Sequence, residues 1–184
     1  MTRLYLVRHG QPWGGYDQDH DPGLDDVGRA QAEAAAAGLA PLGPLPVVTS
    51  PLRRTRETAV PFERQWNVTA SAEPGVGEIK SPTDDLAERS AWLMEILQGR
   101  RRWAELDEER RLWRDGVIIA LLALEVDTVV VTHYMAINAA VGVATSDDRV
   151  VSFRPDNCSC TVLESDGQSL TLVELGRQRE TVVR

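Results

Sequence analysis

Two short apolar runs, each followed closely by a histidine, constrain the fold of this chain most. Residues 3–7 carry mostly large apolar side chains, and this run stops before the turn-former Gly10, which favours a buried strand. After Asp127, residues 128–132 form a continuous β-branched run, typical of a strand buried on both faces. Because ligands bind at the carboxyl ends of strands in open α/β sheets, we expect His9 and His133 at one such edge.

The rest of the chain alternates between helix and strand signals. Asp25 is a predicted N-cap, Ser50-Pro51 a predicted helix start, and Asp166-Gly167 a predicted hairpin turn. The expected helices are 25–39, one beginning at Ser50, a continuous helical region 83–125, and 135–143; the further expected strands are 47–49, 68–72, 158–164 and 169–174. The sequence therefore predicts an α/β fold, a three-layer α/β/α sandwich with a mostly parallel central sheet and a helical insertion at about 83–125.

Composition and charge narrow the functional classes. At 184 residues the chain is expected to form one domain, spanning residues 1–184. Its net charge of −8 argues against general affinity for nucleic acid or anionic membrane. No apolar run reaches membrane-spanning length and no signal-peptide pattern opens the chain, so we expect a cytoplasmic protein. Cys158 and Cys160 are expected to pack as small apolar residues on one strand face.

A cluster of arginines follows the strand predicted at residues 47–49. Three of them, Arg53, Arg54 and Arg56, would stand in the first turn of a helix, where the helix dipole prefers anions. An anionic ligand bound there by backbone N–H groups and a guanidinium explains the cluster better than a solvated surface does. The pattern alone does not choose among the three arginines. His20, in the predicted loop 11–24, is expected to be an ordinary loop histidine.

These strand ends together would form a pocket that suits phosphoryl transfer. Arg8 and one arginine of the cluster would hold phosphate oxygens, because planar guanidiniums bind them bidentately. A neutral imidazole can attack phosphorus and carry the phosphoryl group as a covalent intermediate. The leaving alkoxide would take a proton from a nearby carboxylic acid. Since arginines supply the positive charge, we expect neither a metal ion nor another cofactor.

The same residues resemble a known family. Residues 6–11, LVRHGQ, resemble the signature of the histidine phosphatase superfamily, the phosphoglycerate mutase-like proteins. Residues 21–32, DPGLDDVGRAQA, resemble its "PLT-x-x-G-x-x-QA" helix start, and residues 50–59, SPLRRTRETA, its "SPL-x-RA-x-x-TA" segment. Residues 131–133, VTH, resemble its second histidine motif. The resemblance implies the phosphoglycerate mutase-like fold and points to Arg54 as the second phosphate-binding arginine.

The resemblance also implies a role for each site residue. His9 would be the nucleophile, and Arg8, Arg54 and His133 would hold the transferring phosphoryl group. Gln11 stands where many members carry glutamate, and Tyr134 replaces the usual glycine, so both are expected beside the phosphate. Glu78 lies at about the family's position for the proton donor. Asp84 and Asp85 are its alternatives, because residues 79–82 depart from the "G-x-x-EG" that commonly follows that acid.

The function that we expect is that of a metal-independent phosphatase. It would hydrolyse a phosphomonoester of a small molecule through a phosphohistidine on His9. The first alternative is a phosphoglycerate-type mutase, although the mutases of the family that this sequence resembles have longer chains. A non-catalytic, phosphate-binding or regulatory protein is the second. The sequence does not indicate the physiological substrate or the oligomeric state.

Overall fold

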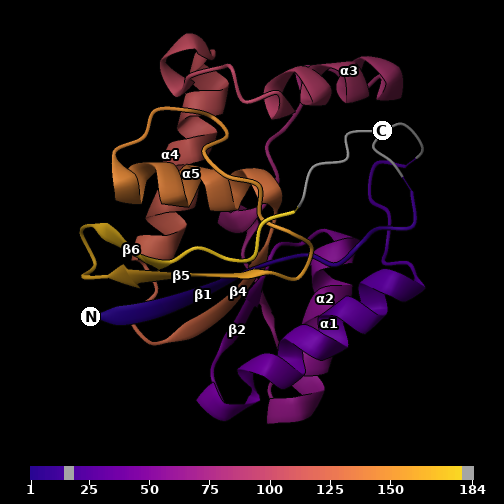
Figure 1. Ribbon diagram of the computed structural model, residues 1–184, viewed down its shortest axis with the longest axis vertical. Coiled ribbons are helices and arrows are strands. Elements are labelled where there is room, and N and C mark those ends of the chain that lie inside the picture. Colours follow the sequence, from indigo (N-terminus) through magenta and orange to yellow (C-terminus); the bar gives the residue numbers. More distant parts are fainter. Residues whose placement is uncertain (15–18, 180–184) are drawn as a thin grey trace.

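A six-stranded sheet organises this computed structural model, which describes residues 1–14 and 19–179 (Figure 1). The strands are β1 (Thr2–Arg8), β2 (Val47–Thr49), β3 (Ser71–Ala72), β4 (Thr128–Thr132), β5 (Cys160–Ser165) and β6 (Leu170–Glu174). Their order in the sheet is β3-β2-β4-β1-β5-β6. The first four strands in this order run parallel, whereas β5 and β6 pair antiparallel at one edge. The predicted, mostly parallel sheet is confirmed.

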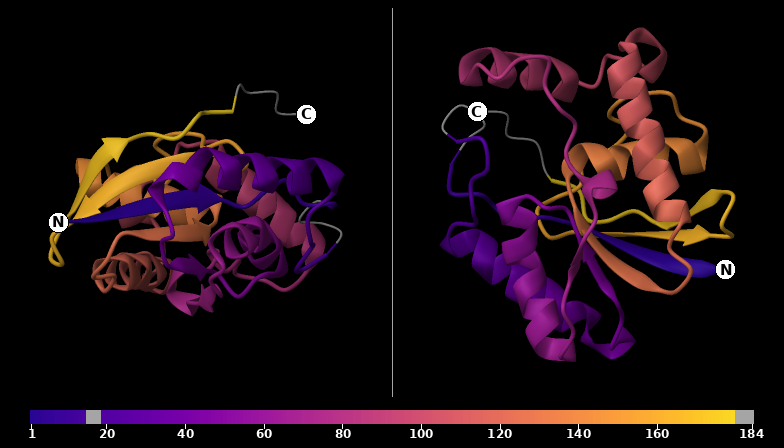
Figure 2. Two further views of the ribbon diagram at one scale, coloured as in Figure 1. Left: turned by 90° about the horizontal axis from the view of Figure 1, so that it is seen from below. Right: turned by 180° about the vertical axis from the view of Figure 1, so that it is seen from behind.

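Helices cover both faces of this sheet. Helices α1 (Asp26–Leu39) and α2 (Arg53–Trp66) lie on one side, and α4 (Glu108–Leu122) and α5 (Tyr134–Thr145) on the other (Figures 1 and 2). Because strand side chains alternate between faces, Tyr5 and Val7 pack in the α1–α2 core, while Leu4 and Leu6 pack in the α4–α5 core. The predicted three-layer α/β/α sandwich is therefore confirmed.

The helical insertion is confirmed, but it is not continuous. Helix α3 (Leu86–Leu97) ends well before α4, and a short 3-10 helix, Trp103–Glu105, stands between them. Gly99 adopts a positive φ of 72°, which turns the chain out of the helix, and Asp107 caps α4 by accepting a hydrogen bond from the Arg110 N–H. The insertion packs on α5 through a third apolar cluster that contains Ile96, Trp103 and Met135.

The start of α2 differs from the prediction. The helix begins at Arg53, and its N-cap residue Leu52 makes no side-chain capping bond. Ser50 does not cap it in the usual way, because its hydroxyl lies 2.8 Å from His133 Nε2 and accepts only a long, 3.3 Å bond from the Leu52 N–H. The Asp21 carboxylate accepts the Arg53 N–H at 2.8 Å instead. The predicted N-cap of α1, Asp25, is confirmed by its bond from the Gly28 N–H.

The two cysteines do not share a strand as predicted. Strand β5 begins at Cys160, and Cys158 precedes it with a φ of 54°, so the expected alternation does not extend to Cys158. Both side chains are half-buried, and burial raises the pKa of each thiol to about 12. These cysteines therefore pack as expected, and their thiols stay protonated. Among the described residues, no helix is long and apolar enough to cross a membrane.

Candidate active site

The predicted site residues follow three neighbouring parallel strands. His9 follows β1, His133 follows β4, and Ser50 follows β2. The strand register pairs Arg8 with Thr132, one step before the two histidines. The two imidazole rings consequently lie edge to face, with their centroids 5.3 Å apart. The structure thus brings both strand-end histidines to one edge, as the pattern of the two apolar runs predicts.

The backbone fixes the tautomer of His9. Its Nδ1 lies 2.8 Å from the carbonyl oxygen of Gly10, which can only accept, so Nδ1 carries the hydrogen. Nε2 is therefore unprotonated in the neutral ring, and it makes no hydrogen bond to any described residue. Burial, reinforced by the Arg54 and Arg8 guanidiniums, holds the pKa of His9 well below its usual range. The ring offers a neutral nitrogen lone pair beside two positive charges.

His133 differs because both of its ring nitrogens have partners. An Arg54 Nη2 hydrogen is donated to Nδ1 at 3.2 Å, so Nε2 carries the hydrogen and donates it to the Ser50 hydroxyl at 2.8 Å. The ring is fully buried, and burial together with Arg54 holds its pKa well below the usual range. His133 is consequently a neutral imidazole clamped from two sides.

Burial distinguishes Arg54 from its two neighbours in the arginine cluster. Arg54 is 1% exposed, whereas Arg53 and Arg56 are exposed and Arg53 pairs with Glu57 at 2.7 Å. Arg54 Nε and Nη1 make no hydrogen bond to the described residues, although Nη1 lies 3.8 Å from the Asp21 carboxylate. Buried N–H donors without hydrogen-bond acceptors are costly unless a ligand accepts them, so this guanidinium is prepared for an anion.

The second arginine, Arg8, contacts Pro155 and Tyr134. Arg8 Nη1 donates to the Pro155 carbonyl at 2.9 Å, and its guanidinium lies 5.1 Å from the centre of the Tyr134 ring. The structure thus places Tyr134 beside Arg8. The Gln11 amide, by contrast, donates to the Asp25 carboxylate at 2.8 Å and so joins the α1 cap.

Glu78 lies close to His133. Its side chain is 7% exposed, and Oε2 is 3.8 Å from His133 Nδ1. Burial raises the pKa of the Glu78 carboxyl, partly offset by Arg54. Because the pKa of His133 is lowered, its ring is neutral and this contact is not a salt bridge. The alternative acids are less suited: Asp84 is exposed, and Asp85 caps α3 through the Glu88 N–H.

Several residues that support the site were not predicted as site residues. Asn157 donates to the His9 carbonyl at 2.9 Å, and Thr58 accepts the Gly10 N–H at 3.0 Å. Neither contact has a local sequence signal, because the partners are 148 and 48 residues apart. A Cβ on Gly10 would lie 2.5 Å from the Gly28 carbonyl oxygen, so α1 packs closely against this turn. His20, as expected, is an exposed loop residue, 3.3 Å from Arg89.

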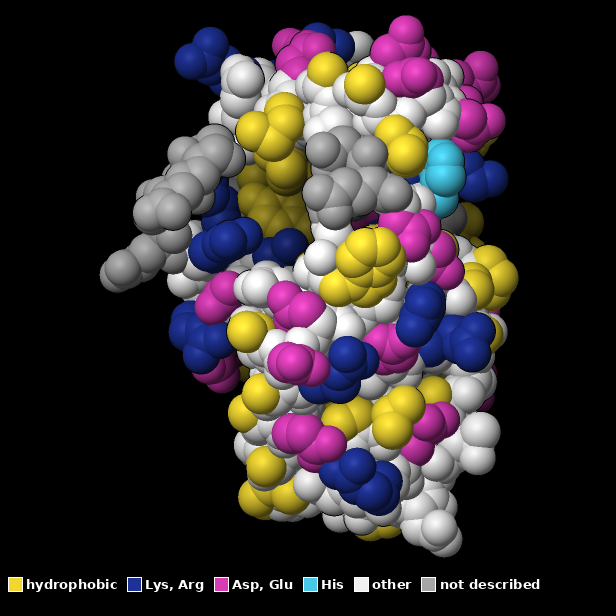
Figure 3. Space-filling model, turned by 90° about the vertical axis from the view of Figure 1, so that its right-hand side faces the viewer, with side chains coloured by type: hydrophobic (Ala, Val, Ile, Leu, Met, Phe, Trp, Pro, Cys, Tyr) yellow, Lys and Arg dark blue, Asp and Glu magenta, His cyan; other side chains and the backbone are white. Residues whose placement is uncertain are grey.

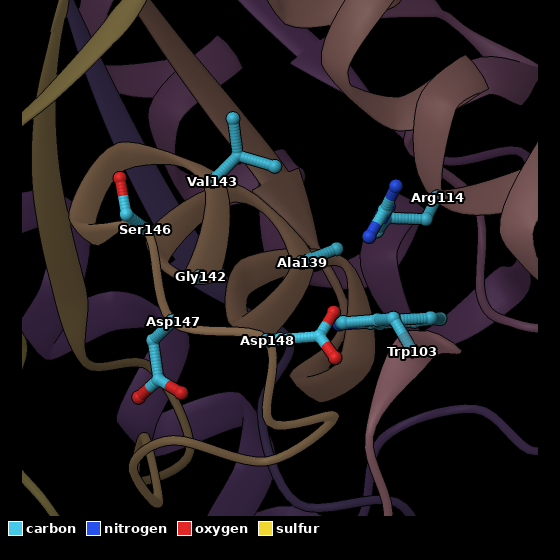
Figure 4. A pocket seen from close by; sticks show the side chains of 8 residues that line it. All are labelled: Trp103, Arg114, Ala139, Gly142, Val143, Ser146, Asp147 and Asp148. Carbon is cyan, nitrogen blue, oxygen red and sulfur yellow. The ribbon is translucent and has the colours of Figure 1, made fainter. Parts of the chain in front are cut away.

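A separate hollow lies along the carboxyl-terminal half of α5 (Figure 4). Its volume is about 230 Å³, and it is lined by Trp103, Arg114, Ala139, Gly142, Val143, Ser146, Asp147 and Asp148. None of the predicted site residues lines it. This hollow is therefore distinct from the cluster around His9.

A protein-family model and several known proteins match parts or most of this sequence. A model of the histidine phosphatase superfamily, branch 1, matches residues 4–178. The chain is 46% identical to a bifunctional protein of Mycobacterium tuberculosis over 68 residues, which are 34% of this chain and 19% of that protein. It is 48% identical over 64 residues to a glucosyl-3-phosphoglycerate phosphatase of Mycolicibacterium vanbaalenii, covering 33% and 28% of the two chains. The chain thus matches less than a third of either relative's length.

Solved structures share the fold over nearly the full length. YhfR of Bacillus stearothermophilus superimposes with a TM-score of 0.75 at 19% identity, over 95% of this chain and 96% of that one. Phosphoserine phosphatase of Entamoeba histolytica, in complex with 3-phosphoglyceric acid, gives a TM-score of 0.72 at 18% identity, over 97% and 98%. At these identities the likeness establishes the fold, and the fold implied by the sequence motifs is confirmed.

Proposed function

Because this chain belongs to branch 1 of the histidine phosphatase superfamily, we propose that it is a phosphatase that works through a phosphohistidine on His9. The observation that carries the proposal is the state of the His9 ring. Nδ1 is bonded to the Gly10 carbonyl, so the free lone pair stands on Nε2. That nitrogen is buried beside Arg54, where an incoming phosphoryl group finds both its nucleophile and its positive charge.

The first step transfers the phosphoryl group to the enzyme. His9 Nε2 attacks phosphorus and forms a P–N bond, while the P–O bond to the leaving alcohol breaks. The Glu78 carboxyl gives its proton to the leaving oxygen, so an alcohol departs and a carboxylate remains. The ring becomes cationic, and its Nδ1 hydrogen stays bonded to the Gly10 carbonyl, which stabilises that charge.

The second step restores the enzyme. A water molecule attacks phosphorus opposite the P–N bond, and the Glu78 carboxylate takes a proton from it. The P–N bond breaks, its electron pair returns to Nε2, and inorganic phosphate leaves. Burial raises the pKa of Glu78, which suits it to both halves of this cycle, because a higher pKa favours the protonated form that must donate before it accepts.

Three groups are proposed to stabilise the phosphoryl oxygens. Arg8 and Arg54 supply two positive charges, and His133 lies against Arg54 as a third contact. With these charges in place we propose that turnover needs no added metal ion. Tyr134, next to Arg8, is proposed to border the phosphate site, whereas Gln11 is proposed to act through the α1 cap that holds the Arg8-His9-Gly10 turn.

We further propose that the substrate is a small phosphorylated molecule. Two similar proteins have such activities in their names, glucosyl-3-phosphoglycerate phosphatase and phosphoserine phosphatase. Acidic and basic side chains are interspersed on the face in Figure 3, so this face is not a continuous basic surface of the kind that binds a polyanion. A single catalytic domain over residues 1–184 and a cytoplasmic location are parts of the same proposal.

A phosphate-release screen tests this function. The purified chain is incubated with a panel of small phosphomonoesters and an aryl phosphate, with and without a metal chelator, and inorganic phosphate is measured. We expect release from several esters, unchanged by the chelator. Conversion of 3-phosphoglycerate to its 2-isomer without phosphate release would favour a mutase. Tight phosphate binding with no release from any ester would favour the non-catalytic alternative and overturn the proposal.

A further inference from the structure

Arg110 of helix α4 is a buried cation outside the cluster around His9. Its side chain is only 8% exposed. The guanidinium contacts three different parts of the chain. It is 5.9 Å from the centre of the Trp92 ring on α3, and it donates to the carboxylates of Asp107 and Glu109 at 3.2 and 2.9 Å. Its charge is therefore largely balanced within the insertion itself.

The remaining two nitrogens of this guanidinium donate to one backbone atom. Arg110 Nε and Nη2 both donate to the Lys80 carbonyl oxygen, at 3.2 and 3.1 Å. A fork of two N–H groups on one acceptor fixes the position of that carbonyl more tightly than a single hydrogen bond. Lys80 is two residues beyond Glu78, so the insertion holds the segment that carries the proposed acid.

This segment has few other restraints. Residues 78–81 belong to no helix or strand. The side chain of Ile79 is buried in the third apolar cluster, and its N–H donates to the Glu78 carboxylate at 3.0 Å. The Ile79 side chain and the Lys80 carbonyl are thus the described anchors on the chain just after Glu78. If the carbonyl were released, the carboxyl could shift by the fraction of an ångström that weakens proton transfer.

We infer that Arg110 is a positioning residue that holds the proton donor Glu78 in place through the Lys80 carbonyl. The inference rests on the proposed function, because it presupposes that Glu78 protonates the leaving group. It gives the helical insertion, which packs on α5, a part in the proposed chemistry. The insertion fixes the acid, while the sheet fixes the nucleophile.

Arg114, one turn further along α4, offers a matched control. Its guanidinium also lies over a tryptophan, 5.6 Å from the Trp103 ring centre, and also pairs with the next residue, Asp115, at 3.0 Å. It makes no described hydrogen bond to residues 78–81 and lines the separate hollow of Figure 4 instead. Replacing it removes a comparable contact between a guanidinium and a tryptophan ring without touching the acid segment.

The test compares leaving groups. The value of kcat/KM reports the step in which the leaving group departs, so it is measured with 4-nitrophenyl phosphate, which needs little protonation, and with glycerol phosphate, which needs much. We expect Arg110→Gln to lower kcat/KM for glycerol phosphate by about 10-fold, part of the 10²–10⁴-fold that a general acid contributes. For 4-nitrophenyl phosphate the loss should be less than about 2-fold, since that leaving group hardly uses the acid. Arg114→Gln should change neither value by more than that factor.

Two further variants make each outcome decisive. Arg110→Lys keeps the charge but not the two-pronged donor, so it should show the same selective loss. This variant keeps the test valid if Arg110→Gln folds poorly. Thermal unfolding checks that each variant is folded. Glu78→Gln serves as the benchmark for a lost acid. Selective loss in Glu78→Gln together with an equal loss for both esters, or no loss, in both Arg110 variants would overturn this inference alone. No selectivity in Glu78→Gln would overturn the acid assignment, and the inference with it.

Discussion

His9 and His133 occupy equivalent places, yet their surroundings differ in one decisive way. Each follows a parallel strand at the same sheet edge, each is buried, and burial with Arg54 lowers the pKa of both. In His133 both ring nitrogens are occupied, by Arg54 and by Ser50. In His9 only Nδ1 is occupied, and by a backbone carbonyl. The number of ring partners, rather than burial or pKa, separates a potential nucleophile from a binding group.

The largest expected effect comes from removing the free nitrogen. In His9→Asn no attacking nitrogen remains, so kcat for an aryl phosphate should fall on the order of 10⁴-fold or more. Steady-state phosphate release measures this loss. Retention of more than a tenth of the activity would show that His9 is not the nucleophile and that the difference between the two rings has no catalytic meaning.

Replacing the other ring should cost less. In His133→Asn the nucleophile remains, while one contact to the transferring group is lost, so kcat should fall about 10²–10³-fold. The variant should still form a covalent phosphoryl-enzyme, which His9→Asn cannot do. If His133→Asn loses activity and labelling as completely as His9→Asn, the two histidines act as one unit and the assigned roles are wrong.

A smaller effect is expected from the serine that holds His133. Ser50→Ala removes the acceptor of the Nε2 hydrogen, and the loss of one hydrogen bond of about 1 kcal/mol should lower kcat by about 5-fold. The ¹⁵N resonances of the His133 ring should shift, whereas those of His9 should not. Ser50→Thr, which keeps the hydroxyl, is the control. Unchanged His133 resonances in Ser50→Ala would remove Ser50 from this role.

Acid should lower the free energy of unfolding through both histidines. The pKa values of both histidines are lowered in the folded chain, so the unfolded chain, in which a histidine has a pKa of about 6.5, binds more protons at low pH. Each neutral ring makes its full contribution to the free energy of unfolding above pH ~6.5. Below that pH each histidine lowers the free energy of unfolding by up to about 1.4 kcal/mol per pH unit. Urea unfolding between pH 7.5 and 5.5 should show a shallower slope in His9→Asn and in His133→Asn. A slope identical to that of the unchanged chain would contradict the lowered pKa values.

The sequence pattern was sufficient to predict the position of those site residues that directly follow a parallel strand. The apolar runs before His9 and His133 placed both rings at one edge, because parallel strands align their carboxyl ends. Choosing Arg54 over Arg53 and Arg56 needed the family resemblance at the sequence level, and burial now supports it independently. The helix starting at Ser50 was misplaced, because a buried imidazole competes for the hydroxyl that would otherwise cap.

Contacts between residues far apart in the sequence could not be predicted from the sequence pattern. Asn157 reaches His9 across 148 residues, and Arg110 reaches Lys80 across 30, with no periodicity that marks either. The break between α3 and α4 was missed because the charged residues around Gly99 include good helix formers, and the positive φ of that glycine overrides them. Local propensity thus describes the elements, whereas the supports of a site depend on tertiary packing.

The most direct measurement is the capture of the covalent intermediate. The enzyme is mixed briefly with a phosphomonoester, quenched in base, digested and analysed by mass spectrometry, with ³¹P NMR as a second readout. We expect one acid-labile phosphoryl group on His9, attached through Nε2 because Nδ1 is bonded to Gly10, and none in His9→Asn. A phosphoryl group on His133, or one that persists in His9→Asn, would contradict the assignment of His9 as the nucleophile.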